Sequence, residues 1–139
     1  MVDTNVIVYL YLDSDQAVEA AHALKMDPDW TSSRLWRSEF RSVLSVYIKR
    51  KILSIENALK VVHEAELFMK EKEYEPSSSE ILRLASASNC SAYDCEFVAL
   101  AHAFNAPLVT CDERLLKAFP SVAVSLKTFA TLLNETIGL

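Results

Sequence analysis

The chain has 139 residues, of which 51% are hydrophobic, and a formal net charge of −5 at pH 7. This length and composition predict one compact domain over residues 1–139. The negative charge argues against binding of nucleic acid through bulk electrostatics, but it leaves room for a nuclease whose metal ions supply local positive charge. The single glycine is Gly138, which excludes Gly-rich phosphate loops of the Walker type and dinucleotide-binding fingerprints.

Hydrophobic periodicity predicts strands that alternate with helices. In chain order, the predicted elements are a strand over Met1–Val2, helices over Asn5–Leu12 and Ser14–Leu24, a strand over Trp30–Ser33, helices over Leu35–Lys51 and Ser54–Lys72, an extended step over Tyr74–Pro76, helices over Ser79–Ser88 and Tyr93–Phe104, a strand over Pro107–Thr110, a helix over Glu113–Phe119, a strand over Val122–Leu126 and a helix over Thr128–Thr136. Such alternation indicates an α/β sandwich with a parallel sheet, whose ligands bind beyond the carboxyl ends of the strands.

The cysteines and histidines argue against a zinc site. Cys90, Cys95 and Cys111 lack C-x₂-C spacing, and the histidines form no H-E-x-x-H motif. The first residues contain no basic segment of the signal-peptide type, and the longest apolar stretch, Val6–Leu12, is too short to span a bilayer. We therefore expect a protein of the reducing cytoplasm.

Four acidic residues occupy positions that are structurally awkward for a carboxylate. Asp3 and Asp112 each end a predicted strand and precede a helix, whereas Glu39 and Asp94 fall on the apolar faces of their helices. Carboxylates against a core repel one another and are costly to desolvate unless a cation joins them. The pattern therefore predicts a divalent-metal site of the kind that cleaves phosphodiesters.

Each of these carboxylates also has a purely structural interpretation. Asp3 and Asp112 are suited to cap the helices that follow them. Glu39 is suited to a buried ion pair with an Arg or Lys, and Asp94 to the third position of a capping box that begins at Ser91. We prefer the metal site because all four positions converge on one hypothesis.

Other charged residues have more ordinary interpretations. Arg34, Arg37 and Arg41 form a basic stripe, which we interpret as a solvated helix face rather than an RNA-binding groove. Glu96 points away from the core side of its helix, so we interpret it as a surface charge. The cysteines beside the acids are interpreted as packing residues.

Four segments occur in a characteristic order across nearly the whole chain: Val2–Asn5, the helix that carries Glu39, Tyr93–Ala101 and Leu108–Leu115. Together they resemble the PIN-domain ribonucleases, and within them the short VapC-like toxins of bacterial and archaeal toxin–antitoxin pairs. The resemblance implies an α/β/α sandwich with a central, mostly parallel sheet of about four to five strands.

The resemblance also implies an activity, a cofactor and partners. In the family, four acidic residues bind Mg²⁺ or Mn²⁺ and cleave RNA. The matching residues are Asp3, Glu39, Asp94 and Asp112, with Thr4, Asn5 and Thr110 resembling the polar residues that orient the carboxylates. A homodimer and an antitoxin protein are implied as well. Because no basic residue lies beside the acids in sequence, we expect the antitoxin to insert an Arg or Lys near them.

Two departures from the family pattern are visible. Only Met1 and Val2 precede Asp3, where relatives have a longer first strand, so either the sheet edge is short or the true start lies upstream. Asn89 and Cys90 occupy a turn where relatives have a glycine, although Asn tolerates left-handed backbone. Neither departure affects an expected ligand.

Two other classes of function remain as alternatives. The first is a non-enzymatic interaction module, with the same fold and an idle acid cluster, which Mg²⁺-dependent RNA cleavage would rule out. The second is a phospho-receiver domain, which needs an adjacent acidic pair after the first strand and a late strand-end Lys. Asp3-Thr4 lacks the pair, and no Lys ends Pro107–Thr110, so we set this class aside.

Overall fold

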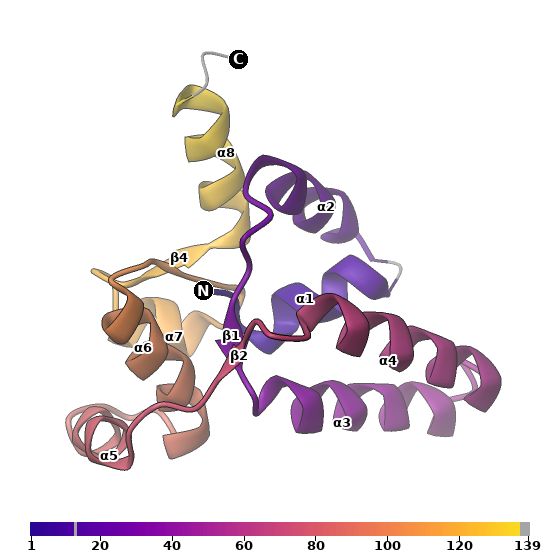
Figure 1. The fold of residues 1–139 in the computed structure, drawn as a ribbon, viewed down its shortest axis with the longest axis horizontal. Helices are drawn as coiled ribbons and strands as arrows, with labels where there is room; N and C mark the ends of the chain where they lie inside the picture. The colour runs from indigo at the N-terminus through magenta and orange to yellow at the C-terminus, as the bar shows by residue number, and fades with distance from the viewer. Residues whose placement is uncertain (13, 137–139) are drawn as a thin grey trace.

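The elements of the structure, a computed structural model, follow the predicted order (Figure 1). Residues 1–12 and 14–136 are described, except for the side chains of residues 133, 134 and 136, so the end of the expected 1–139 domain, with Gly138, lies outside the described residues. No described helix has the length and apolar character needed to cross a membrane. The elements are α1 (Thr4–Tyr11), α2 (Ala17–Met26), β1 (Ser32–Ser33), α3 (Trp36–Lys49), α4 (Ile55–Met69), β2 (Glu73–Tyr74), α5 (Ser78–Ser86), α6 (Ala92–Phe104), β3 (Leu108–Thr110), α7 (Glu113–Ala118), β4 (Ala123–Ser125) and α8 (Leu126–Thr136).

Short parallel strands lie at the centre of the molecule, with the N-terminal residues between them. β1 pairs with β2 and β3 pairs with β4, both in parallel. The N–H of Val2 donates to the carbonyl of Thr31 at 2.9 Å, and the hydroxyl of Ser32 donates to the carbonyl of Val2 at 2.8 Å. On its other side, Val2 forms a parallel bridge with Val109. The extended segments are therefore adjacent in the order β2, β1, N-terminal residues, β3, β4.

The expected central sheet of four to five strands is wrong, although the α/β class and the parallel direction are confirmed. The described strands form two separate two-stranded sheets. The reason is length, since β1 and β2 contain two residues each and Asp3 begins the turn into α1 directly after Val2. Pro76, which has no N–H to donate, follows β2 closely and limits pairing there.

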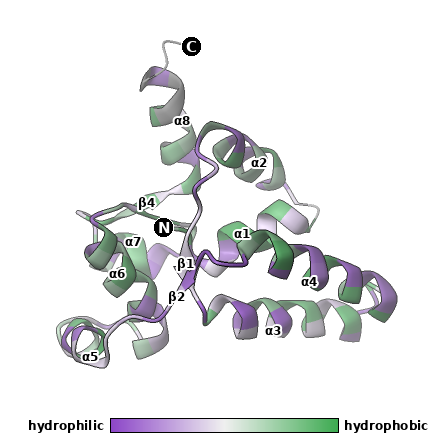
Figure 2. Cartoon of the chain, viewed as in Figure 1, coloured by the Kyte–Doolittle hydropathy of each residue, from purple (hydrophilic) through white to green (hydrophobic). Residues whose placement is uncertain are grey.

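Hydrophobic side chains pack into two cores on opposite sides of these segments. Val2 and Val109 belong to the first core, with residues of α1 to α4 and α8. Met1 and Leu108 belong to the second core, with residues of α5 to α7. This division follows from strand geometry, because successive side chains point to opposite faces. Hydrophobic residues predominate in α1 and α6, which supply the centres of the two cores (Figure 2).

An aromatic cluster sets the orientation of α3, the helix that carries Glu39. Trp36 and Phe40 are fully buried, with ring centroids 5.5 Å apart, and Phe40 contacts Tyr11 of α1 at 6.4 Å. Burial of this face fixes the rotation of α3 about its own axis. The direction of the Glu39 side chain follows from that rotation.

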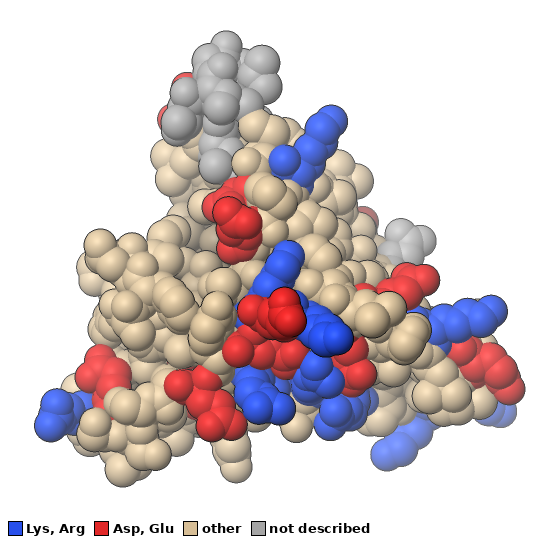
Figure 3. Space-filling view, in the orientation of Figure 1, with Lys and Arg blue, Asp and Glu red and all other residues tan. Residues whose placement is uncertain are grey.

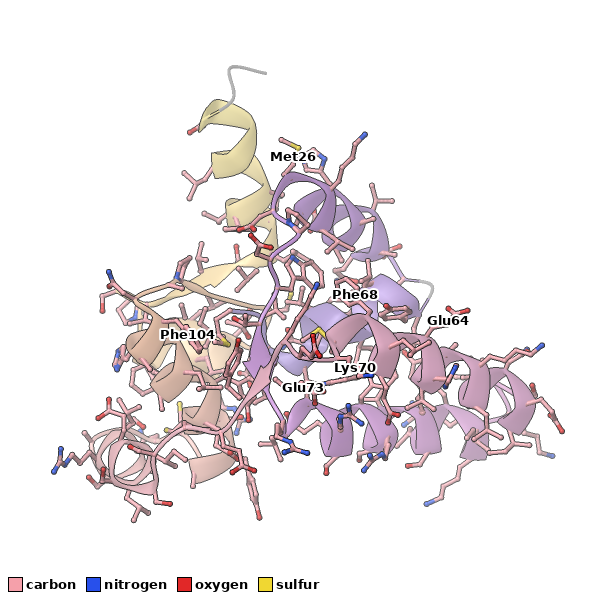
Figure 4. The ribbon with its side chains drawn as sticks, viewed as in Figure 1. Met26, Glu64, Phe68, Lys70, Glu73 and Phe104 are labelled. Atoms are coloured by element: carbon pink, nitrogen blue, oxygen red, sulfur yellow. The ribbon has the colours of Figure 1, made fainter. Side chains whose placement is uncertain are left out.

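Glu73 of β2 connects the central strands to α3 (Figure 4). Its carboxylate accepts one hydrogen bond from the Trp36 indole at 3.0 Å and two from the Arg37 guanidinium at 2.7 Å each. The hydrogen bonds from Arg37 hold the pKa of Glu73 below its usual value. Arg37 and Arg41 also pair with Glu66 of α4 at 3.6 Å. Two residues of the basic stripe that was expected to be solvated, Arg37 and Arg41, thus form ion pairs. Figure 3 shows basic and acidic side chains interleaved where β2, α3 and α4 meet.

Left-handed backbone occurs at three non-glycine residues among those described. Lys51, Glu71 and Asn105 have φ values of 58°, 66° and 48°. Asn105 ends α6, a position that suits Asn. Asn89 is not among them, so the turn before α6 does not use the left-handed conformation that Asn would tolerate there.

We predict that Glu73→Gln lowers the free energy of unfolding by about 1–3 kcal/mol. The amide removes the negative partner of Arg37 and places an N–H₂ where an acceptor is needed. Glu64→Gln, at an exposed position on α4, is the matched control and should change stability by less than about 0.5 kcal/mol. Urea unfolding measures both variants, and equal stabilities would contradict the connecting role of Glu73.

Candidate active site

Asp3 lies where the N-terminal residues turn into α1, and it is only 7% exposed. Its Oδ1 accepts a hydrogen bond from the N–H of Thr4 at 2.7 Å, so Asp3 does cap α1. Its Oδ2 accepts from the Thr110 hydroxyl at 2.7 Å and from the Asn5 amide at 3.2 Å. The same carboxylate therefore serves as a helix cap and as a link to the end of β3.

Asn5 and Thr110 join α1 to the segment after β3. The side-chain oxygen of Asn5 accepts from the N–H of Cys111 at 3.2 Å, and its Nδ2 lies 3.4 Å from the Thr110 hydroxyl. That hydroxyl also accepts from the N–H of Asp112 at 3.0 Å. These bonds fix the position of Asp112 relative to Asp3, although 108 residues lie between them in the sequence.

Glu39 reaches the same region from α3. The hydroxyl of Thr4 donates to its Oε1 at 2.7 Å. Among the described residues, no Arg or Lys forms an ion pair with Glu39, so the alternative of a buried ion pair is not found. Burial raises the pKa of Glu39, the bond from Thr4 opposes that rise, and the charges of Asp3 and Asp94 raise it further.

Asp94 lies in the first turn of α6 and has an unsatisfied oxygen. The Ser91 hydroxyl accepts from the N–H of Asp94 at 3.1 Å, which is the first half of the expected capping box. Oδ2 of Asp94 is buried and has no hydrogen-bond partner. A buried carboxylate oxygen without a donor is costly, so a cation at this atom would lower the energy of the site.

Asp112 caps α7, and Arg114 extends over both Asp112 and Asp94. Oδ1 of Asp112 accepts from the N–H of Arg114 at 2.9 Å. The guanidinium Nη2 of Arg114 lies 3.6 Å from Asp112 Oδ2 and 3.8 Å from Asp94 Oδ2. The fold therefore brings a cation beside two of the acids, although no basic residue directly adjoins any of the four in the sequence. Asp112 and Arg114 are two positions apart, and residues at that spacing do not share a helix face. From the sequence, only the position of Asp112 at the start of α7 indicated that the two side chains could meet.

Glu96 is the second charged residue whose surroundings differ from those expected. It is partly buried rather than solvated, and burial raises its pKa against a hydrogen bond from Ser33. Its charge contributes to the raised pKa of Glu39. The reason is tertiary, because α6 packs against β1 and covers a face that helical periodicity assigned to solvent.

The electrostatics of Asp3 show that the carboxylates affect one another. Burial is the main reason that the pKa of Asp3 rises from 3.8 to about 6, although the hydrogen bonds that it accepts oppose the rise. The charges of Asp94 and Asp112 raise it further. The charges of Asp3 and Asp94 also raise the pKa of Glu39. Each of the four acids therefore interacts electrostatically with at least one of the others.

The PIN domain family model matches residues 1–120 of the chain. The chain belongs to the PIN domain family. PIN domains are generally metal-dependent nucleases, and they act on RNA in general. A search of the curated proteins found no match to this sequence.

The acids of this PIN domain have the chemistry that a hard divalent cation requires. All four side chains offer carboxylate oxygens, which suit Mg²⁺ and Mn²⁺. Oδ2 of Asp94 accepts no hydrogen bond, and its ion pair with the exposed Arg114 is long, at 3.8 Å. The pKa of Asp3 is raised first by burial and further by the charges of Asp94 and Asp112. Within residues 1–12 and 14–136, no three His, Cys, Asp or Glu side chains gather closely enough to form a ready-made metal site. The four carboxylates therefore lie near one another without forming a complete coordination shell.

We predict that Asp3→Asn gains stability relative to wild type as pH rises in the presence of EDTA. A carboxyl group whose folded pKa is raised contributes stability that is fully present below its unfolded value, here 3.8, and lost as pH rises through about 6. The difference in unfolding free energy between variant and wild type should therefore shift between pH 4 and pH 7.5 by up to the order of 3 kcal/mol.

The matched control is Asp29→Asn, at an exposed position. Urea unfolding at several pH values measures all three proteins. The size of the change with pH is the readout, because Asn also alters the hydrogen bonds that Asp3 accepts and so shifts stability at every pH. An equal pH dependence for both variants would contradict the raised pKa of Asp3.

Proposed function

We propose that this PIN domain is a Mg²⁺- or Mn²⁺-dependent endoribonuclease that cleaves RNA phosphodiesters at Asp3, Glu39, Asp94 and Asp112. The observation that carries the proposal is the buried Oδ2 of Asp94, which has no hydrogen-bond partner. A structural acid at this position would be expected to have a donor for each buried oxygen. A carboxylate oxygen that accepts no hydrogen bond has its lone pairs available for a cation.

The proposed roles follow the position of each acid. Asp3, Asp94 and Asp112 would hold the principal ion, and Glu39 would hold a second ion or orient the attacking water. A cation held by these carboxylates would lower the pKa of an attacking water and would stabilise negative charge on the phosphate. The chain itself contributes fixed carboxylates in a partly buried site, where charges act more strongly than in bulk water.

The neighbouring polar residues support this by limiting the motion of two of the carboxylates. Thr110 and Asn5 donate to one oxygen of Asp3, and the N–H of Thr4 donates to the other. The Thr4 hydroxyl holds one oxygen of Glu39. Ligands that are already oriented lose less conformational freedom when a cation binds.

We predict that Asp94→Asn and Asp3→Asn each lower the rate of RNA cleavage by at least about 10²-fold, because an amide supplies no ligand charge to a hard cation. Glu113→Gln is the matched control, since Glu113 is exposed and directly follows Asp112. The measurement is Mn²⁺-dependent cleavage of structured RNA, followed on denaturing gels. Wild-type activity in purified Asp94→Asn would contradict the assignment.

Measurements of stability distinguish a variant that is folded but inactive from one that has lost its fold. Asp94→Asn should be as stable as wild type or more stable in EDTA at pH 7, because Asp94 Oδ2 accepts no hydrogen bond and its ion pair with the exposed Arg114 is weak. Mn²⁺ should raise the melting temperature of wild type by mass action and that of the variant much less. An inactive wild type with a metal-independent melting temperature would favour the interaction module with an idle acid cluster.

We also propose that the protein acts in the cytoplasm as the toxin of a toxin–antitoxin pair and that it forms a homodimer. The support is the resemblance of the acidic segments to VapC-like toxins, in the same order along the chain. An inhibitory partner would place an Arg or Lys near the carboxylates and bury apolar surface beside them.

The expected result is a dimer by light scattering at roughly tens of micromolar protein. A monomer under these conditions would contradict the dimer. The product of a neighbouring reading frame should inhibit RNA cleavage. Inhibition that persists after its basic tail residues are replaced would contradict the proposed mode of inhibition.

A further inference from the structure

A pocket of about 400 Å³ opens beside the acidic residues, between the α5–α6 loop and α7. Ser88, Asn89 and Cys90 line it from the loop, and Arg114 and Lys117 line it from α7. No Asp or Glu is among the residues that line it. In a protein with a net charge of −5, a pocket with two cations and no acid is suited to an anion.

Arg114 belongs both to this pocket and to the acidic site. Its Nη2 lies 3.6 Å from Asp112 Oδ2 and 3.8 Å from Asp94 Oδ2, distances of an ion pair rather than of a hydrogen bond. The side chain is 72% exposed. An exposed pair of this kind is weak, so the guanidinium is free to exchange one anionic partner for another.

The other basic residues near the site are less available. Arg37 is held by hydrogen bonds to Glu73 at 2.7 Å, and Arg41 lines a different pocket, between α3 and α4, together with Glu66. By contrast, no ion pair of Lys117 is found among the described residues, and this lysine lies three positions after Arg114 on the same side of α7. Arg114 and Lys117 are therefore the cations best placed to meet a substrate that approaches the carboxylates.

We propose that this pocket binds a backbone phosphate of the RNA adjacent to the phosphodiester that is cleaved. Arg114 pairs with Asp94 and Asp112 while they lack a metal ion, and it turns to the RNA phosphate when a divalent cation takes its place. Lys117 contacts the phosphate in either state. The inference rests on the proposed nuclease function, because it takes the four carboxylates as the site of cleavage.

The first test is the affinity for Mn²⁺ without RNA, measured from melting temperatures over a Mn²⁺ series. Arg114 competes with the cation, so Arg114→Ala should bind Mn²⁺ about twofold to fivefold more tightly, the range expected for an exposed ion pair. Lys117→Ala and the matched control Arg50→Ala, at an exposed position at the end of α3, should match wild type. A Mn²⁺ affinity of Arg114→Ala equal to or weaker than that of wild type would overturn the exchange.

The second test is the binding of a short single-stranded oligoribonucleotide, measured by fluorescence anisotropy at several salt concentrations. Ca²⁺ replaces Mn²⁺ because it also takes oxygen ligands, and gels verify that the RNA stays intact. In Ca²⁺, Arg114→Ala and Lys117→Ala should each reduce the slope of log affinity against log salt by about 0.7, the value for one phosphate contact on a single strand. In EDTA, only Lys117→Ala should reduce this slope, because Arg114 then pairs with Asp94 and Asp112. Slopes equal to that of Arg50→Ala in both conditions would overturn the phosphate site.

The two proposals fail in different ways. RNA cleavage that depends on Asp94, together with unchanged RNA binding by Arg114→Ala and Lys117→Ala, would remove the phosphate pocket and retain the nuclease. No cleavage by wild type, together with the expected salt slopes, would remove the nuclease and retain an RNA-phosphate pocket.

Discussion

The hydrogen bonds of one buried carboxylate, that of Asp3, hold the candidate site together. At this residue the N-terminal segment leaves the strands and α1 begins. Thr110 and Asn5 donate to Asp3 and thereby connect the end of β3 to α1. The next residue, Thr4, extends the network to Glu39 on α3. A change in the position of Asp3 would therefore displace parts of three elements that lie far apart in the sequence.

The same network concentrates negative charge in a partly buried region, which has a cost for the fold. Burial and neighbouring acids raise the pKa of Asp3 and Glu39, and no buried Lys or Arg within the described residues offsets this. The cation that does approach, Arg114, is largely exposed. A buried partner would satisfy the acids permanently, whereas an exposed one forms a weak and exchangeable pair. Under the proposed metal-dependent function, this arrangement would cost stability and leave the acids available to a divalent cation.

Helices were predictable from this sequence, and sheets were not. The hydrophobic periodicity of α3, α4 and α6 comes from neighbours three and four residues apart, so the order and approximate extent of the helices follow from local sequence. Strand pairing joins segments that are distant in sequence, such as Val2 and Val109. Such contacts form a continuous sheet only if each segment stays extended for long enough to pair with its neighbours. Here the turn at Asp3 and the missing N–H of Pro76 shorten the paired segments.

The sequence by itself determined the α/β class, the order of the helices, and the set of acids that stand against apolar faces or follow strands. It also excluded phosphate loops built from glycine, because the chain has one glycine. Only the tertiary structure decided that Arg114 lies over Asp94 and Asp112, that Glu96 is partly buried, and that Arg37 is held by Glu73. The physical reason is that a charged side chain pairs with the groups that the packed helices and strands bring near it. That packing depends on contacts between residues that are distant in the sequence.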